Sequence, residues 1–187
     1  MIDDVFVENF VKREKSVYTT LFKVFSIMAT AILILAIFLI PIFLGINVLF
    51  VSAVASFAVG FACYYLNTRQ NIEFETSLTN DDFTFTKIIN ENKRELLTSF
   101  NLKECNRIAP VTADSFEQDK KDSSLVINAT RYSELKKEDS NWYCFVESDG
   151  MKYMVIFEFN ERMYKAFRRY NPRNTHFMRI TAKKDEE

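Results

Sequence analysis

Side chains that commonly catalyse reactions or bind metal ions are few and scattered in this 187-residue chain. The three cysteines, Cys63, Cys105 and Cys144, lie far apart, without a C-x-x-C pair or a neighbouring histidine. A zinc site or a disulfide framework needs more ligands at closer spacing, so we interpret the cysteines as unrelated small apolar side chains. The single histidine, His176, follows the last expected helix, where a solvated side chain is a simpler interpretation than a catalytic base.

The glycines do not form a loop that could bind phosphate groups. Such a loop needs several closely spaced glycines, whereas this chain has three isolated ones. They are Gly45, Gly60 and Gly150. Adjacent carboxylates at residues 81–82 and 138–139 lie in expected surface turns, where solvated charge is the default. We therefore expect no cofactor, no metal ion, no small-molecule substrate and no enzymatic activity.

Charged residues are distributed very unevenly along the chain. Although 48% of the residues are hydrophobic and the formal net charge is −1, residues 24–68 carry no charged side chain at all. This composition is typical of a membrane anchor joined to a soluble domain. After Arg69 the basic and acidic residues nearly balance, so no electrostatic field favours nucleic acid as a partner. We assign residues 69–175 to one soluble domain and residues 176–187 to a polar C-terminal tail.

The uncharged segment is long enough for two membrane-spanning helices. One span needs ~20 apolar residues, because the hydrocarbon core is ~30 Å thick and a helix rises ~1.5 Å per residue. Pro41 and the turn residues 45–47 mark a break near the middle of the segment. We expect helices at about residues 24–44 and 48–66, which together form a transmembrane hairpin over residues 24–68.

Basic residues flank this hairpin at one end only, and the turn between the helices has no lysine or arginine. The residues expected at the membrane interface are Lys12, Arg13, Lys15, Lys23 and Arg69. The positive-inside rule then places both termini in the cytoplasm of a multi-pass protein of the cell membrane, with the lipid bilayer as its first partner. The N-terminal tail, residues 1–23, could lie along the inner interface as a helix or extend the first membrane helix, since Phe6 and Phe10 could share one helical face.

Small residues recur every four positions along the second expected helix, at Ser52, Ser56 and Gly60. Small side chains let helix backbones approach closely in lipid, where packing drives helix association. This stripe could pack on the first helix of the same hairpin, or it could form the seam of a homodimer or a contact with other membrane proteins. No ionisable side chain lies in either expected span, which argues against a transporter.

The soluble domain has the alternating pattern of a β-rich fold. We expect six or seven antiparallel strands within residues 72–159, with a mobile loop at residues 112–124 and a tight hairpin turn at residues 148–150. Asn160 can then cap a C-terminal helix. The predicted fold class is an α+β membrane protein, in which the transmembrane hairpin precedes a bent antiparallel sheet or partial barrel covered by that helix, a pleckstrin-homology-like arrangement.

Several short motifs spread over most of the chain carry a family resemblance. They are Asp4-Val5-Phe6, Val11-Lys12-Arg13, Glu73-Phe74-Glu75, Leu78-Thr79-Asn80, residues 155–161 and Asn171-Pro172-Arg173. On these motifs the chain resembles an uncharacterised bacterial membrane-protein family in which two transmembrane helices precede a pleckstrin-homology-like domain. The resemblance implies the fold but no activity. Phosphoinositide-binding domains of this fold use basic residues in the first hairpin, whereas the turn here is Asn80-Asp81-Asp82, so the resemblance does not imply headgroup binding at that turn.

These features favour a membrane-tethered, non-catalytic interaction module. The expected binding face for a partner protein or anionic lipid is the polar side of the C-terminal helix. Its cations are Arg162, Lys165, Arg168, Arg169 and Arg173. The competing explanation of this face is electrostatic, since cations near a helix C-terminus stabilise the helix by ~0.3–1 kcal/mol each. The alternative function is a structural subunit of a larger membrane complex that docks through its transmembrane helices.

Overall fold

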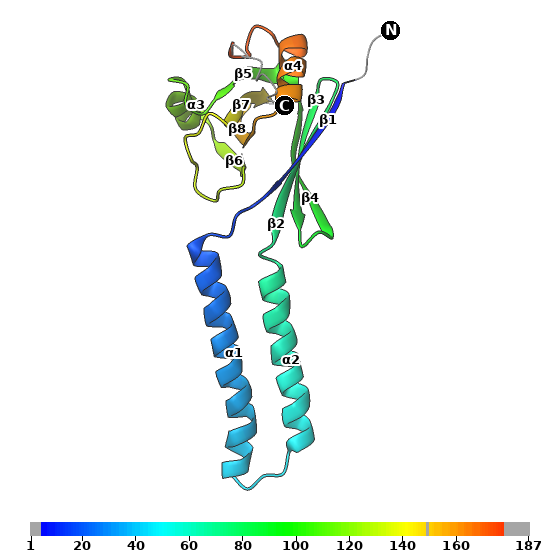
Figure 1. Cartoon of the computed structure of the whole chain (residues 1–187), viewed down its shortest axis with the longest axis vertical. Helices are drawn as coiled ribbons and strands as arrows, with labels where there is room; N and C mark the ends of the chain where they lie inside the picture. The colour runs from blue at the N-terminus through cyan, green and yellow to red at the C-terminus, as the bar shows by residue number, and fades with distance from the viewer. Residues whose placement is uncertain (1–4, 149, 178–187) are drawn as a thin grey trace, which may run out of the picture.

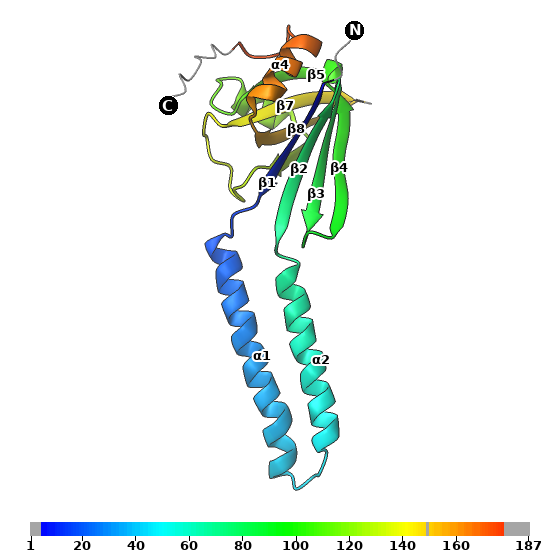
Figure 2. The same cartoon turned by 45° about the vertical axis from the view of Figure 1, so that its right-hand side comes forward.

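The computed structural model describes residues 5–148 and 150–177. Two long helices lie side by side and extend from one end of a β-rich domain (Figure 1), and Figure 2 shows the same arrangement from a second direction. In chain order the elements are β1 (Phe6–Lys12), α1 (Val17–Phe43), α2 (Leu49–Thr68), β2 (Ile72–Thr79), β3 (Asp82–Ile89), β4 (Lys93–Asn101), the short 3-10 helix η1 (Leu102–Glu104), β5 (Cys105–Pro110), α3 (Phe116–Asp122), β6 (Leu125–Ala129), β7 (Asn141–Ser148), β8 (Met151–Glu158) and α4 (Glu161–Tyr170).

The helices α1 and α2 are both long and apolar enough to cross a membrane, judged by length and composition. Their ends near the turn agree with the predicted spans, but α1 begins at Val17 and therefore includes Lys23. At the other end α1 stops at Phe43, and Gly45 adopts a φ of +67° as the chain reverses. This left-handed conformation suits glycine because glycine has no Cβ to clash with the backbone.

The N-terminal tail begins with a strand, so the expected interfacial helix is wrong, whereas residues 17–23 extend the first long helix, as the second alternative expected. β1 pairs antiparallel with β2 along its whole length. Val7 and Val11 lie in the core, whereas Phe6 and Phe10 on the opposite face are exposed, as the two-residue period of a strand requires. A helix would instead have placed Val7 and Val11 on the same side as Phe6 and Phe10. The domain therefore has a strand on each side of the hairpin, and the predicted domain of residues 69–175 lacks the first strand.

The described strands form two four-stranded sheets. The first has the order β1-β2-β3-β4 and the second has the order β5-β7-β8-β6. The strand pairs are antiparallel except for β6 and β8, which run parallel, so the prediction of a purely antiparallel sheet is wrong at this edge. After β6, residues 130–140 pass one end of β8 and lead into β7, on the other side of β8 in the sheet. β7 runs antiparallel to β8, which follows it in the chain. As a result, β6 and β8 point in the same direction.

The predicted mobile loop of residues 112–124 contains the helix α3. Its Phe116 is buried and packs edge-on against Tyr143, with 5.3 Å between the ring centroids. A single large apolar residue in so short a segment leaves no helical period to detect in the sequence. The predicted hairpin turn at residues 148–150 includes Asp149, which lies outside the described residues, as does most of the predicted tail of residues 176–187.

Three aromatic side chains join the two sheets to the C-terminal helix. Phe83 of the first sheet lies 5.3 Å from Phe157 of the second sheet and 5.5 Å from Phe167 of α4, centroid to centroid. All three rings are fully buried, and their edge-to-face contacts are worth about 0.5–1.5 kcal/mol each beyond the area they bury. The N-terminus of α4 is capped as predicted, because the Asn160 side chain accepts a hydrogen bond from the Arg162 backbone N–H at 2.9 Å.

The β1 register makes a prediction that separates a strand from a helix. Val11 is 4% exposed and Phe10 is 54% exposed. We expect Val11→Ser to destabilise the domain by about 1–3 kcal/mol, because it removes buried methyl groups and buries a hydroxyl. The neighbouring Phe10→Ser should cost less than about 1 kcal/mol, as exposed positions usually do. Denaturant unfolding of the full-length chain, followed by the fluorescence of Trp142, measures both values. A larger loss from Phe10→Ser would contradict the strand.

Candidate functional site

Two of the predicted membrane-interface cations are built into the domain. Lys12 pairs with Glu73 across β1 and β2, with 3.1 Å between the ammonium nitrogen and the carboxylate oxygen. Arg13 donates a hydrogen bond of 2.6 Å to the carbonyl of Asn128, and its guanidinium carbon lies 4.5 Å from the centroid of the Phe74 ring. Burial lowers the pKa of Arg13 below its ordinary value. Together these contacts fasten the end of β1 to β2 and β6.

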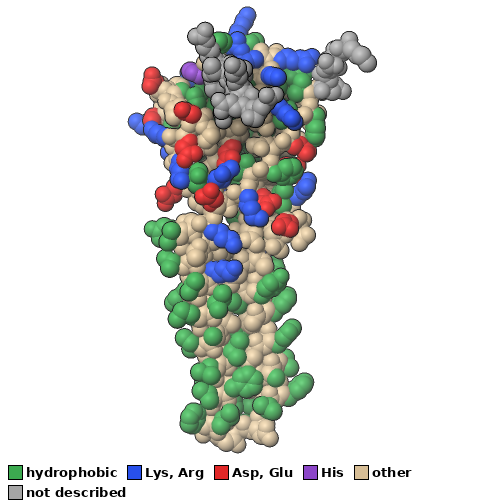
Figure 3. Space-filling model, in the orientation of Figure 1, with side chains coloured by type: hydrophobic (Ala, Val, Ile, Leu, Met, Phe, Trp, Pro, Cys, Tyr) green, Lys and Arg blue, Asp and Glu red, His purple; other side chains and the backbone are tan. Residues whose placement is uncertain are grey.

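The other three predicted interface cations, Lys15, Lys23 and Arg69, lie at the neck. We define the neck as the junction of the hairpin with the domain, where residues 13–30 face residues 60–71. Within the part of the chain that the structure describes, the side chains of Lys15 and Lys23 form neither an ion pair nor a hydrogen bond, although the Lys23 carbonyl accepts one from the Ser26 hydroxyl. Hydrophobic side chains cover the helices, whereas lysine and arginine side chains gather at the neck and on the domain (Figure 3).

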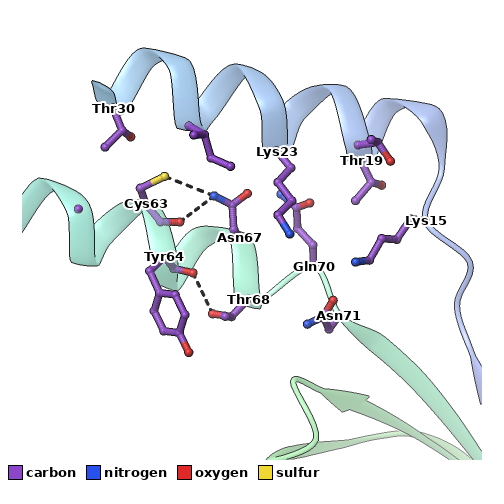
Figure 4. A pocket seen from close by; sticks show the side chains of 13 residues that line it. Lys15, Thr19, Lys23, Thr30, Cys63, Tyr64, Asn67, Thr68, Gln70 and Asn71 are labelled. Carbon is purple, nitrogen blue, oxygen red and sulfur yellow. Dashed lines mark hydrogen bonds between the residues drawn. The ribbon is translucent and has the colours of Figure 1, made fainter. Parts of the chain in front are cut away.

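A pocket of about 560 Å³ opens between α1 and α2 at the neck. The polar residues of this neck pocket include Lys15, Thr19, Lys23, Asn67, Gln70 and Asn71. Its volume lies in the ~300–1,000 Å³ range of small-molecule sites. The two lysines reach toward the space between α1 and the start of β2, and the lining contains no carboxylate (Figure 4). The neck pocket therefore has the charge and the donors to hold an anionic group.

Polar contacts between the helices form one wall of the neck. The Asn67 side-chain amide donates hydrogen bonds to the Cys63 carbonyl at 2.9 Å and to the Ser26 hydroxyl at 3.1 Å, which joins α2 to α1. Interhelical hydrogen bonds of this kind contribute about 0.6–2 kcal/mol in a membrane. On the outer side of α2, Arg69 lies over the Tyr65 ring with 4.5 Å to its centroid, and it donates a hydrogen bond to the Tyr65 hydroxyl.

The predicted small-residue stripe divides between two environments. Ser52 is 5% exposed and donates a hydrogen bond of 3.2 Å to the carbonyl of Ile37, so this position packs inside the hairpin. Ser56 is half-buried. Gly60 lines the neck pocket, and a Cβ at this position would meet no atom within 4 Å. The first alternative, packing on α1, accounts for Ser52, while the homodimer seam stays a prediction.

The helix α4, which carries the predicted cationic face, lies at the end of the domain opposite the hairpin (Figures 1 and 2). Arg162 and Lys165 are exposed there, as predicted. Arg168 instead donates a hydrogen bond of 2.9 Å to the carbonyl of Pro172, which contributes to the end of the helix. Arg173 lies beyond α4 in a separate groove. This face therefore lies far from the lipid that would surround membrane-spanning α1 and α2, and its binding of a partner protein or of anionic lipid stays a prediction.

A buried polar network escaped the sequence analysis. Asp119 of α3 accepts hydrogen bonds from Arg107, at 2.7 and 2.8 Å, and from the Tyr143 hydroxyl at 2.8 Å. The Ser115 hydroxyl lies 2.9 Å from the same Tyr143 oxygen, and burial raises the pKa of Tyr143 to about 12. Every member of this set has a partner, so the network holds α3 on the second sheet. Its residues are widely separated in the sequence and share no motif.

The neck pocket did leave a signal in the sequence. Thr19, Lys23 and Ile27 recur every four residues and therefore share one face of α1, and Lys15 continues the same spacing. That face is polar near the domain and apolar further into the hairpin. Such a stripe was visible in the sequence, but its convergence with Asn67 on α2 depends on how the two helices are rotated against each other.

Comparison with known proteins supports the fold. The chain matches the sequence model of a family described as a bacterial PH-like domain (DUF6106) over residues 3–177. No curated protein and no solved structure matches the chain. The match confirms the resemblance noted in the sequence, and it extends over the strand that precedes the hairpin.

Arg13 and Lys15 lie two positions apart in the sequence and allow a matched test. Arg13→Gln should destabilise the domain by about 1–3 kcal/mol, since it removes a charge-assisted hydrogen bond and a cation–π contact. Lys15→Gln makes a similar change in charge at a solvated position and should shift stability by less than about 0.5 kcal/mol. Thermal unfolding of both full-length variants in the same detergent gives the comparison. Equal losses would show that the Arg13 contacts contribute nothing specific.

Proposed function

The chain belongs to the bacterial PH-like domain family, and on that basis we propose that it is a membrane-anchored, non-catalytic interaction module. In this proposal α1 and α2 cross the cell membrane and hold the PH-like domain at its inner face. The observation that carries the proposal is the pairing of β1 with β2. Strands of one sheet must lie on the same side of a membrane, so the chain between them has to cross an even number of times.

The distribution of charge supports a cytoplasmic position of the domain. Lys15, Lys23 and Arg69 flank the hairpin at the domain end, while residues 44–48 at the turn carry no charge. Positively charged flanks favour the cytoplasmic side. Both termini of the chain would then lie in the cytoplasm, because β1 precedes the hairpin and the rest of the domain follows it.

Short connections support a module that presents one fixed face. β1 ends at Lys12 and α1 begins at Val17, while α2 ends at Thr68 and β2 begins at Ile72. Two short connections restrict both the distance and the rotation of the domain relative to the membrane more than one flexible linker would. Such restriction raises the effective concentration of the domain for partners on the same membrane.

The face offered to a partner is the cationic side of α4. Met163, Ala166 and Phe167 on the opposite side of this helix are buried, so the fold does not depend on the exposed cations. Arg162 and Lys165 face solvent at the end of the domain furthest from the hairpin. An acidic segment of a cytoplasmic or membrane-bound protein complements this charge and this position. The favourable interaction of cations with the helix dipole explains the cations in the last turn of α4, but it does not explain Arg162 at the start of the helix.

Cysteine labelling tests the topology. The native Cys105 and Cys144 are buried and Cys63 is half-buried, so the unmodified chain should react little with a membrane-impermeant maleimide. We expect Asn47→Cys, at the turn, to be labelled in intact cells. Lys137→Cys, on the exposed surface of the domain, should be labelled only after lysis. Labelling of Lys137→Cys from outside the cell would overturn the proposed orientation.

Co-purification tests the partner face. The full-length chain would be isolated in mild detergent together with its bound proteins, which are then identified by mass spectrometry. We expect the double substitution R162E/K165E to lose a specific acidic partner. The control K120E/K121E, on the exposed side of α3, changes the net charge equally and should retain it. Retention by both variants, or loss from both, would contradict α4 as the binding face.

A further inference from the structure

The neck pocket lies at the depth where lipid headgroups meet hydrocarbon. This depth rests on the proposed membrane anchorage. The uncharged part of α1, Val24–Phe43, is about 30 Å long at ~1.5 Å per residue, which matches the hydrocarbon thickness of a bilayer. Lys23 then sits at the boundary and Lys15 lies about two turns further into the headgroup region. Ile27 and Gly60, in the lower part of the pocket, lie at hydrocarbon depth.

The chemistry of the lining changes with this depth. The upper part presents two ammonium groups without ion-pair partners in the described chain, together with the hydroxyl of Thr19 and the amides of Gln70 and Asn71. These groups match a phosphate ester and the hydroxyl groups of a polyol. The lower part is an apolar recess beside Gly60, where a missing side chain leaves open space. A ligand that fits both parts has an anionic head and a hydrocarbon tail.

We infer that the neck pocket binds one anionic glycerophospholipid from the surrounding membrane. Its phosphate lies between Lys15 and Lys23, and one acyl chain descends along α1 past Gly60. The headgroup carries no ammonium of its own, because a third positive charge beside two unpaired lysines would be repelled. Phosphatidylglycerol has this chemistry, whereas phosphatidylethanolamine and phosphatidylcholine do not. The bound lipid would offset one of the two lysine charges and fill the space between the helices directly below the domain.

Native mass spectrometry of the full-length chain in mild detergent tests the inference. The chain would be mixed separately with dioleoyl phosphatidylglycerol, dioleoyl phosphatidylethanolamine, dioleoyl phosphatidylcholine and glycerol 3-phosphate. We expect one phosphatidylglycerol per chain, retained about tenfold more strongly than either zwitterionic lipid, since each lysine near an anionic surface adds roughly 1 kcal/mol. Glycerol 3-phosphate carries a phosphate monoester, with more negative charge than the lipid's diester but no tail, and should not be retained.

Two pairs of variants assign the binding to the neck pocket. The substitutions K15Q/K23Q should reduce phosphatidylglycerol retention by about tenfold or more. The control K120Q/K121Q removes the same charge on the exposed side of α3 and should leave retention unchanged. Gly60→Leu should fill the recess without a backbone clash and so reduce phosphatidylglycerol retention. Ala62→Leu adds the same side chain at an exposed position outside the pocket and should leave retention unchanged.

The possible outcomes separate this inference from the proposed function. Equal retention of the three lipids, or wild-type retention by K15Q/K23Q, would overturn the lipid site while the anchor stands. Retention of glycerol 3-phosphate as strong as that of phosphatidylglycerol would assign the pocket to a soluble anion and also overturn the lipid site. Recovery of the chain in the soluble fraction without detergent would contradict the anchor itself.

Discussion

The pairing of β1 with β2 is the constraint on which the rest of the molecule depends. It places the whole hairpin as an insertion between two neighbouring strands of one sheet. Paired strands lie about 4.8 Å apart, whereas packed helices need about 8–10 Å between their axes. Residues 13–16 and 69–71 absorb this difference, so the chain separates between the last strand pair and the first close helix contact at Ser26 and Asn67. The neck pocket lies in this region because neither the sheet nor the helix packing fills it.

Within the described chain, Arg13 makes contacts within the domain, whereas Lys15 and Lys23 at the neck do not. Arg13 is half-buried, and its planar guanidinium can both lie on the Phe74 ring and donate to a carbonyl, although its Nε has no hydrogen-bond partner among the described residues. Lys15 and Lys23 remain solvated and keep their charge available. In the sequence all three were basic residues that precede one apolar segment. Their division into structural and exposed cations follows from tertiary contacts, which the local pattern does not encode.

The sequence predicted the elements with long, unambiguous periods and missed those that depend on partners. The hairpin helices and the strands after residue 72 were predictable because their apolar period is uniform. The tail was not, because Phe6, Val7, Phe10 and Val11 include apolar pairs on both faces of a strand and therefore also fit one side of a helix. Its true conformation is decided by the free edge of β2, which lies beyond the hairpin in the sequence. The parallel orientation of β6 was missed for a similar reason, since a strand's own residues do not specify the direction of its neighbour.

The position of β1 also sets the order in which the protein can be assembled. During synthesis β1 emerges before both membrane helices, and its partner β2 emerges after them. The first strand must therefore wait, unpaired and with Val7 and Val11 exposed, until β2 has emerged, and in the proposed topology the hairpin must first enter the bilayer and return the chain to the same side. The first sheet can be completed only after β2 has emerged, so in the proposed topology correct insertion precedes the folded domain, and a β1 that fails to meet β2 leaves an unfinished sheet with an open edge.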